Sequence, residues 1–485
     1  MHTYKISLKT TCHDEKTLNK VYWWMFKLHN QVVSFAKKCF RKLNSNKEYH
    51  LLLKEYHKLK KIKNKTSIQE TRRKEIGKAL NKIQESVGLS KIGLEKFVKV
   101  QQKKYSKYIS SQQAQKEADR VWEGASKVLY SNGKELHYKK ATNFRTITGK
   151  SPENGIKFRD DHILFGDLSI PCKLEHSDYE KESLNHDLKY CELVREKFNS
   201  GYRFYVNLYL EGNPPVKYKI GKGTVGIDPG VSTEAVVAKD KLILEELAPD
   251  FKKYNKKIAN LQRKTDRSIR IMNPNNYNLD GTFRSCKKEW RYSNNCKRLK
   301  WKTAVAYRKK SNYIKHSNNA LANKIIQRGR RFFIESMNFK ALAKKANKIE
   351  HPKTEKERCK RRKRYGSSMN NRAPAQIITT ITRKVTEQNG SVYRNNTSKC
   401  KASQFNHHTG ECEKTKLNSR TKIINGHKVQ RDLYSAFLFR NSEITLDGFN
   451  IEYCNVRFEN FIKMHDELIA EMKQNGISMK QCFGF

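Results

Sequence analysis

Three acidic residues could carry chemistry, because each lies in or beside an apolar run that a fold would bury. Asp228 lies within the run 223–238, Glu335 ends the run 331–335, and Asp432 lies in the first turn of a helix expected over 430–438. A buried carboxylate is unfavourable unless a cation compensates its charge, and its oxygens suit Mg²⁺ or Mn²⁺ rather than zinc. A single Asp at a strand end more simply caps a turn, so only the three acids together indicate a metal site.

The segments around these acids predict a sheet with helices beside it. β-branched residues and turn residues such as Pro229-Gly230 favour strands, and Lys239-Asp240 predicts a hairpin turn. Between the third and fourth strands lies a basic segment, in which we expect one helix to end at Lys264. The expected elements are, in order, two strands within 223–238, a strand at 242–244, the basic helix ending at 264, a loop at 272–276, a helix at 301–327, a strand at 331–335, a helix at 373–385, a further strand, and the helix with Asp432.

The N-terminal half has a different pattern. Residues 2–9 alternate as a strand does, and from Leu18 onward apolar residues recur every three or four positions, which predicts Lys-rich helices to about Leu129. Short strands then follow, including a hairpin around Asp160-Asp161. These strands and the first one would form a small barrel into which the helical region is inserted.

The charge balance indicates a polyanionic partner. The 485 residues include 101 Lys and Arg against 48 Asp and Glu, a formal net charge of +53. A charged surface can serve solubility alone, but this excess disfavours a compact state unless a polyanion neutralises it. The basic residues are spread along the whole chain, which favours a large nucleic-acid surface whose affinity falls with salt.

The three acids lie in short motifs: Gly-Ile-Asp-Pro-Gly at 226–230, Phe-Ile-Glu-Ser-Met-Asn at 333–338 and Arg-Asp-Leu-Tyr-Ser-Ala at 431–436. Through the order and spacing of these motifs, the chain resembles the RuvC-type nuclease domain of the TnpB transposon proteins and of the type V CRISPR effectors. Each motif is weak alone, and the three together are specific. The resemblance is close over the C-terminal half and concerns only the layout of the N-terminal half.

The resemblance implies an α+β multidomain fold. A β-barrel wedge domain with an inserted helical recognition lobe would precede a RuvC/ribonuclease H-like α/β nuclease domain that carries a degenerate zinc-ribbon insertion. The expected domain ranges are wedge 1–12 and 131–215, helical lobe 13–130, nuclease 216–395 and 429–485, and ribbon or target-strand-loading insertion 396–428.

The resemblance also implies a chemistry and partners. Two Mg²⁺ ions about 4 Å apart would be held by Asp228, Glu335 and Asp432, with Asp228 bridging both ions from the central strand. Glu335 could instead pair with a nearby arginine. Arg420 is placed where related nucleases have an arginine near the scissile phosphate, although it could equally be a surface residue. The expected partners are a guide RNA, held by the wedge domain and the helical lobe, and double-stranded target DNA with a short flanking motif.

Two departures from the family pattern concern the region before Asp432. Many relatives carry a four-cysteine zinc ribbon there, whereas this interval holds only Cys400 and Cys412 with His407 and His408, and no Cys-x-x-Cys pair. We therefore expect no structural zinc, with a Cys/His site as the alternative. In the last motif, Tyr434 occupies a position where relatives commonly have Asn. Because all three acids are present, we do not expect a nuclease-dead relative.

Other sequence features concern localisation. The basic run formed by Lys360, Arg361, Arg362, Lys363 and Arg364 is typical of a nucleic-acid groove or a localisation signal. Eleven scattered cysteines and the absence of a signal peptide favour a reduced chain in the cytoplasm, associated with the nucleoid in a prokaryote. No apolar run approaches the roughly 18 residues that a membrane span needs, so we expect no membrane partner.

The sequence favours an RNA-guided DNA endonuclease of the TnpB-like group. A compact type V CRISPR effector would share its chemistry and differ in the source of the guide. A nuclease-silent RNA-guided repressor and a guide-free resolvase or transposase are the alternatives from other classes. The number of protomers on one RNA stays open.

Overall fold

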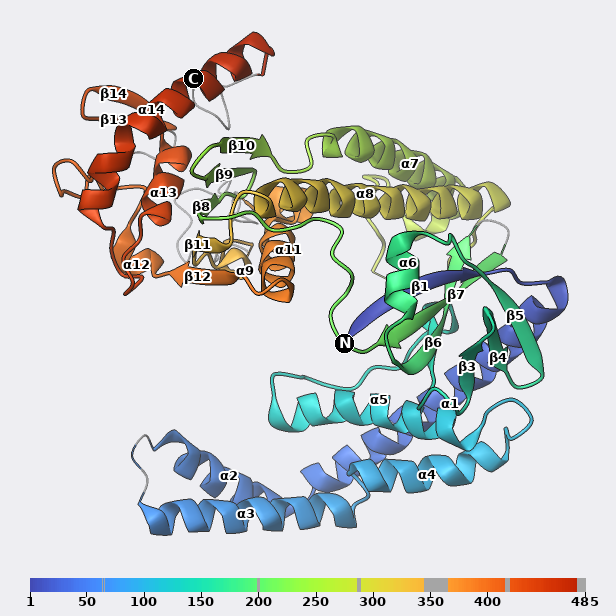
Figure 1. The fold of residues 1–485 in the computed structure, drawn as a ribbon. Coiled ribbons are helices and arrows are strands. Elements are labelled where there is room, and N and C mark those ends of the chain that lie inside the picture. The colour runs from blue at the N-terminus through green and yellow to red at the C-terminus, as the bar shows by residue number, and fades with distance from the viewer. Residues whose placement is uncertain are drawn as a thin grey trace. The chain divides into compact units, whose positions relative to one another are not determined.

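The computed structural model describes residues 1–62, 64, 66–198, 201–285, 289–343, 365–414 and 419–477. It is a mixed α/β chain of two compact units, Met1–Pro215 and Val216–Phe485 (Figure 1). No described helix is long and apolar enough to cross a bilayer.

The first unit combines a bundle of helices with one sheet. Its helices are α1 (Cys12–Asn44), α2 (Lys47–Lys61), α3 (Ser67–Ser86), α4 (Lys91–Lys103), α5 (Ser111–Tyr130) and α6 (Asp178–Leu184), with the short 3₁₀ helix η1 (Ala141–Asn143). Its strands are β1 (His2–Leu8), β2 (Thr146–Thr148), β3 (Ile156–Arg159), β4 (His162–Phe165), β5 (Leu168–Lys173), β6 (Leu188–Phe198) and β7 (Gly201–Leu210). The order in the sheet is β2-β6-β7-β1-β5-β4-β3, and the sheet is nearly closed because β3 returns to lie beside β6.

Local sequence explains the main elements of this unit. Thr11 caps α1, and its side chain and that of Asp14 exchange hydrogen bonds with each other's backbone N–H groups. The predicted hairpin is present between β3 and β4, and Asp160 and Asp161 both have the positive φ that a two-residue turn of this kind requires.

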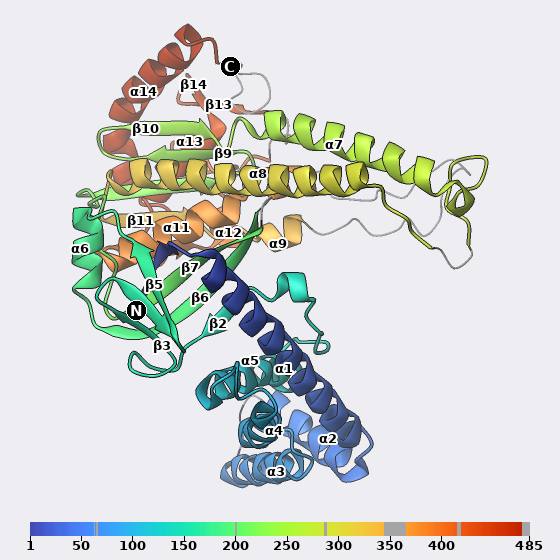
Figure 2. The ribbon, with the colours of Figure 1, turned by 90° about the vertical axis from the view of Figure 1, so that its right-hand side faces the viewer.

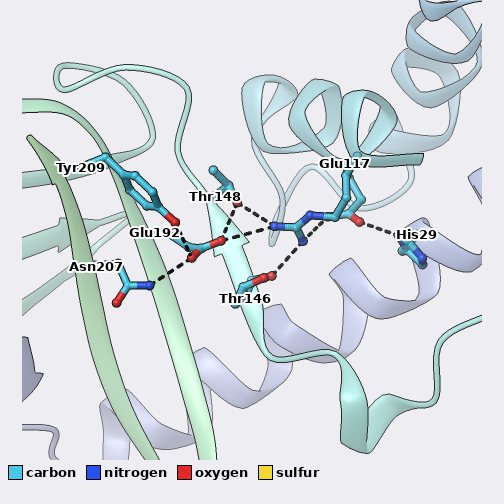
Figure 3. Close-up of polar contacts among 8 residues, drawn as sticks. His29, Glu117, Thr146, Thr148, Glu192, Asn207 and Tyr209 are labelled. Atoms are coloured by element: carbon cyan, nitrogen blue, oxygen red, sulfur yellow. Dashed lines mark hydrogen bonds and ion pairs between the residues drawn. The ribbon is translucent and has the colours of Figure 1, made fainter. Parts of the chain in front are cut away.

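A buried ionic network joins the helices of the first unit to its sheet (Figure 3). Glu117 of α5 bonds to His29 of α1 and to Arg120. Arg120 also donates to Thr148 of β2 at 2.7 Å and lies 3.5 Å from Glu192 of β6. Burial would raise the pKa of Glu117, but the hydrogen bond from His29 and the charge of Arg120 outweigh burial and lower it. Glu117 is therefore held as a carboxylate at the point where helix and sheet meet.

The second unit contains the three acids. Its helices are α7 (Phe251–Met272), α8 (Asn294–Ile326), α9 (Phe339–Leu342), α10 (Gly366–Arg372), α11 (Pro374–Glu387), α12 (Thr397–Cys400), α13 (Arg431–Arg440) and α14 (Ile451–Gln474), with the 3₁₀ helix η2 (Pro274–Asn276). Its strands are β8 (Thr224–Pro229), β9 (Thr233–Val237), β10 (Leu242–Glu246), β11 (Arg331–Glu335), β12 (Ser391–Asn395) and the separate hairpin β13 (Thr421–Ile424) and β14 (His427–Gln430).

The five-stranded sheet of this unit has the order β10-β9-β8-β11-β12. The first three strands of the chain pair antiparallel, whereas β11 runs parallel to β8 and β12 runs parallel to β11. One face packs on α8 and α11, and the other packs on α13 and α14 (Figure 1). The strand β8 is therefore central and buried on both faces, as its continuous apolar run predicts.

Two predicted helix ends are wrong. The basic helix does not end at Lys264 but continues to Met272, because no Gly or Pro interrupts it before Pro274 and α8 packs along it. The following helix begins at Asn294 rather than at 301, because Ser293 caps it by accepting a hydrogen bond from the backbone of Cys296.

Candidate active site

The sheet brings two of the acids together at one edge. In the parallel pair β8–β11, Ile227 lies opposite Ile334, so Asp228 and Glu335 follow at adjacent positions. Val225 and Ile227 pack in the core on the α8 side. Because side chains alternate along a strand, Asp228 projects to the opposite face, which α13 covers.

The third acid comes from α13. Asp228, Glu335 and Asp432 line a single cavity of about 270 Å³, together with Arg420 and Arg431. The three candidate acids and the candidate arginine, which lie far apart in the sequence, therefore meet at one site.

A glycine sets the distance between α13 and the central strand. A Cβ atom on Gly226 would lie 2.0 Å from the carbonyl oxygen of Ala436 and 2.3 Å from the amide nitrogen of Arg440. Gly226 precedes Asp228 by two residues on the same face of the strand, and Ala436 follows Asp432 by one helical turn. The missing side chain at Gly226 thus allows the two carboxylates to approach.

Asp228 and Glu335 shift each other's pKa. The pKa of Asp228 lies well above its usual range because of burial and because of the charges of Glu335 and Asp432. Burial also raises the pKa of Glu335, and the hydrogen bond from Asp228 opposes that shift. Of the two, Asp228 is therefore the acid that keeps its proton to the higher pH. The alternative pairing of Glu335 with an arginine is not found among the described residues.

Asp432 is held by nitrogen donors. Its Oδ2 lies 3.3 Å from Nη1 of Arg420 and 3.3 Å from Nε2 of Gln430, and its Oδ1 lies 3.4 Å from Nη2 of Arg431. These contacts are long, so they position the carboxylate without binding it tightly. A cation at the cavity would compete with the two arginines for Asp432.

The donor set fits a hard divalent cation. Three carboxylates line one cavity, and burial raises the pKa of both Asp228 and Glu335. Among the described residues, no three His, Cys, Asp or Glu side chains lie close enough to one another to enclose a metal ion as they stand. Asp228, Glu335 and Asp432 would hold the Mg²⁺ or Mn²⁺ that the sequence implies.

The cysteines and histidines of the insertion do not gather at one point. Cys400 is buried and its Sγ lies 3.4 Å from the carbonyl oxygen of Leu446, whereas Cys412 and His408 are exposed. His407 is buried, and burial, followed by the charge of His408, lowers its pKa to about 4.

Hydrogen bonds, rather than a metal ligand set, hold the described part of the segment 396–428 in place. The hydroxyl of Tyr434 accepts a hydrogen bond from the backbone N–H of His407 at 3.0 Å and donates to its Nδ1 at 2.7 Å. The buried ammonium group of Lys422 donates to the carbonyl oxygens of Gln404 and Phe405 at 2.6 and 3.0 Å. Tyr434 thus connects His407 to the helix of Asp432.

Two residues of the site were not predicted. Arg431 lines the cavity beside Asp432, and Gln430 caps α13 by accepting a hydrogen bond from the backbone of Leu433 at 2.6 Å. The only sequence signal was their position directly before Asp432. The basic run 360–364 lies outside the described residues.

Comparisons with known proteins give structural neighbours only. No model of a protein family matches the chain, and no curated protein matches it. A cryo-EM structure of a CRISPR-Cas12f ternary complex is similar at 12% identity and a TM-score of 0.26, over 90% of this chain and 86% of that chain. A Cas12i complex with crRNA and double-stranded DNA is similar at 9% identity and a TM-score of 0.27, over 93% of this chain and 65% of that chain. TM-scores this low do not establish a common function.

Proposed function

We propose that this chain is an RNA-guided DNA endonuclease of the TnpB-like group with one Mg²⁺-dependent site. The observation that carries the proposal is the arrangement of Asp228, Glu335 and Asp432 around one cavity beside two arginines. The order of the five-stranded sheet, with the third, second, first, fourth and fifth strands side by side, is also that of ribonuclease H-like nucleases. A fold hosts many functions, so the side chains carry more weight than the strand order.

The reaction is hydrolysis of a phosphodiester. Water adds to phosphorus, one P–O ester bond breaks, and a hydroxyl end and a phosphate end result. Bound Mg²⁺ would supply an activated water and neutralise charge on the phosphate. Asp228 would bind the ion as a carboxylate, so its raised pKa opposes binding at low pH. Arg420 and Arg431, which contact Asp432 in the same cavity, would bind the phosphate oxygens.

The first unit and the insertion have proposed roles as well. A wedge domain at 1–12 and 131–215 and a helical lobe at 13–130 would hold the guide RNA and read a short motif beside the target. Base pairing with the guide would supply sequence specificity. The nuclease domain would comprise 216–395 and 429–485, with the degenerate ribbon at 396–428 between its parts.

The RNA that accompanies the protein tests the guided part of the proposal. The chain is expressed with its native flanking DNA and purified, and the bound RNA is sequenced. An RNA that overlaps the end of the gene indicates a transposon-derived guide, and repeat-derived RNA indicates a type V CRISPR effector. If no defined RNA stays bound to the protein at moderate salt, the proposal of an RNA-guided enzyme is wrong, and a guide-free resolvase or transposase replaces it.

The cutting step is tested by Asp228→Ala. We expect plasmid cleavage with Mg²⁺ to fall on the order of a thousandfold or more, because a metal ligand is lost, while RNA binding is unchanged. Asp240→Ala is the control, since Asp240 lies in a surface turn and its ion pair among the described residues is a long one, with Arg328 at 3.5 Å. Cleavage retained in Asp228→Ala contradicts the site. A wild-type chain that binds guided DNA without cutting it is the nuclease-silent alternative.

A further inference from the structure

The helices α7 and α8 form a long arm that the proposed chemistry does not use. They lie side by side and project away from the five-stranded sheet (Figure 2). Between them lies a groove of about 550 Å³, which we name the arm groove. Its walls carry Lys264 and Arg267 from α7 and Arg298 and Lys302 from α8.

The charge of the arm groove is uncompensated. No acidic side chain lines it, and among the described residues none of its four cations forms an ion pair with a carboxylate. Asp266, which lies between Lys264 and Arg267 in the sequence, is bound by Arg270 at 2.9 Å. A solvated helix surface usually mixes both signs of charge, whereas like charges across a groove repel each other until an anion enters.

The floor and the outer end of the groove are apolar. Leu261 and Leu299 lie between the cations, and Leu299 is buried. At the outer end, the segment that joins the two helices exposes the rings of Phe283, Trp290 and Tyr292. Cations beside exposed rings are the surface that proteins use for single strands, because phosphates meet the cations and bases stack on the rings.

The shape favours a single strand over a duplex. Two packed helices have axes about 8–10 Å apart, so a duplex cannot enter the groove between them, whereas one unpaired strand can. The cations on each wall are three or four residues apart, a rise of about 4.5–6 Å, so they can meet successive phosphates.

The inner end of the arm leads to the candidate active site. A second basic surface on α7, with Lys256 and Lys257, continues from Lys264 towards the start of the helix. Just before α7, the backbone N–H of Leu247 donates to the carbonyl oxygen of Ser232, which lines the cavity of the three acids. The cations therefore continue from the outer end of the arm to the start of α7, and the segment before α7 is bonded to a residue of the cavity.

We propose that the arm groove binds single-stranded DNA and leads it to the cavity of the three acids. The choice of DNA rests on the proposed function, because DNA is the strand that the site would cut. The binding itself follows from the charge and shape of the groove.

The test compares two sets of four substitutions in the full chain, both in the Asp228→Ala background so that no DNA is cut. The groove set is Lys264→Gln, Arg267→Gln, Arg298→Gln and Lys302→Gln. The control set changes Lys252, Arg263, Lys297 and Lys309 to Gln, which are exposed cations on the same helices outside the groove. Both sets remove the same charge and keep good helix formers.

Affinity for a labelled oligo-dT strand is measured by fluorescence anisotropy over a range of salt. The groove set should bind at least about tenfold more weakly than the control set, and its slope of log K against log salt should be smaller by about 3, at roughly 0.7 per lost phosphate contact. Tyr292→Ala alone should weaken binding by about tenfold through lost stacking. Equal losses in the two sets overturn the proposal.

Two further probes separate the alternatives. A duplex of the same length should lose no more affinity in the groove set than in the control set, and a larger loss overturns the single-strand assignment. An oligo-U strand that loses affinity while oligo-dT does not means that the occupant is RNA, which overturns the assignment to DNA. Every protein in this test carries Asp228→Ala, and every measurement is of binding rather than of cleavage. Failure of the proposed groove is therefore distinguishable from failure of the proposed cleavage site.

Discussion

At the scale of the residue, the site combines groups that are unfavourable without a ligand. Asp228 and Glu335 are adjacent carboxyls, and the pKa of each is raised by burial. A further acid, Glu234, is fully buried and has no hydrogen-bond partner among the described residues, and burial raises its pKa as well. Such groups destabilise a fold, so a protein keeps them mainly where its function needs them. Acids with perturbed pKa values in a cavity therefore indicate a functional site.

The raised pKa of Asp228 predicts a pH dependence. A raised carboxyl pKa adds stability that is complete below the unfolded value of about 4 and is lost as pH rises through the folded value. The metal-free protein should therefore melt at a lower temperature at about pH 8 than at about pH 6. Mg²⁺ affinity should rise with pH, by up to about tenfold per unit while one proton is displaced.

Thermal melts with and without Mg²⁺ check this, with Asp228→Asn as the comparison. That variant should be more stable than the wild type when metal-free at the higher pH, and should gain less from Mg²⁺. Glu234 contributes in the same direction in both proteins, so the difference between them isolates Asp228. A wild-type pH profile identical to that of Asp228→Asn would exclude a raised pKa at Asp228.

Tyr434 gives a second prediction at this scale. Tyr434→Phe removes the acceptor of the buried N–H of His407 and should lower the free energy of unfolding by about 1–3 kcal/mol. Tyr453→Phe is the control, because Tyr453 is 51% exposed. Urea unfolding of both variants measures the difference, and equal stabilities would mean that the Tyr434–His407 contact contributes nothing.

At the scale of the element, the position of α13 decides whether the acids meet. The helix lies against β8 at Gly226, where no side chain fits. It is further held by its cap Gln430 and by the hairpin β13–β14 that leads into it. The third carboxylate is therefore placed by packing rather than by its own strand.

Gly226→Ala should displace this helix. Overpacking of this kind typically lowers stability by about 1–3 kcal/mol, and it should reduce cleavage more than it reduces RNA binding, because Asp432 moves away from Asp228. Gly366→Ala is the matched control, since a Cβ atom there meets nothing within 4 Å. Cleavage and unfolding are measured on the same preparations. Normal cleavage by Gly226→Ala would show that the close packing is not needed.

At the scale of the whole molecule, charge dominates. A net charge of +53 makes the free protein repel itself and attract polyanions. Hydrophobic cores in both units and ion networks such as that of Glu117 and Arg120 hold the fold against this repulsion.

Salt should therefore act with opposite signs on stability and on binding. Added NaCl should raise the melting temperature of the RNA-free protein, because it screens the repulsion, and should weaken nucleic-acid binding, because fewer counterions are released. Melting and binding are followed over the same salt series. A melting temperature of the free protein that falls with salt would contradict this account of its charge.

The sequence by itself determined most of the elements and selected the three acids as candidates. Periodicity and turn residues located the strands of Asp228 and Glu335 and the helix of Asp432, because local propensity and buried faces leave a clear pattern over a few residues. Two predicted ends of the arm helices were wrong. The helix α7 continues past Lys264 because its sequence gives no stop signal before Pro274, and α8 begins earlier because Ser293 caps it.

Only the tertiary structure decided how these parts meet. The mutual pKa shifts of Asp228 and Glu335 depend on the register of two parallel strands, and the place of Asp432 depends on the contact of Ala436 with Gly226. The arginine Arg431, the Tyr434–His407 contact and the arm groove likewise join residues from different elements. Contacts between distant segments leave no periodic trace in one sequence, which is why these features could be found only in the folded chain.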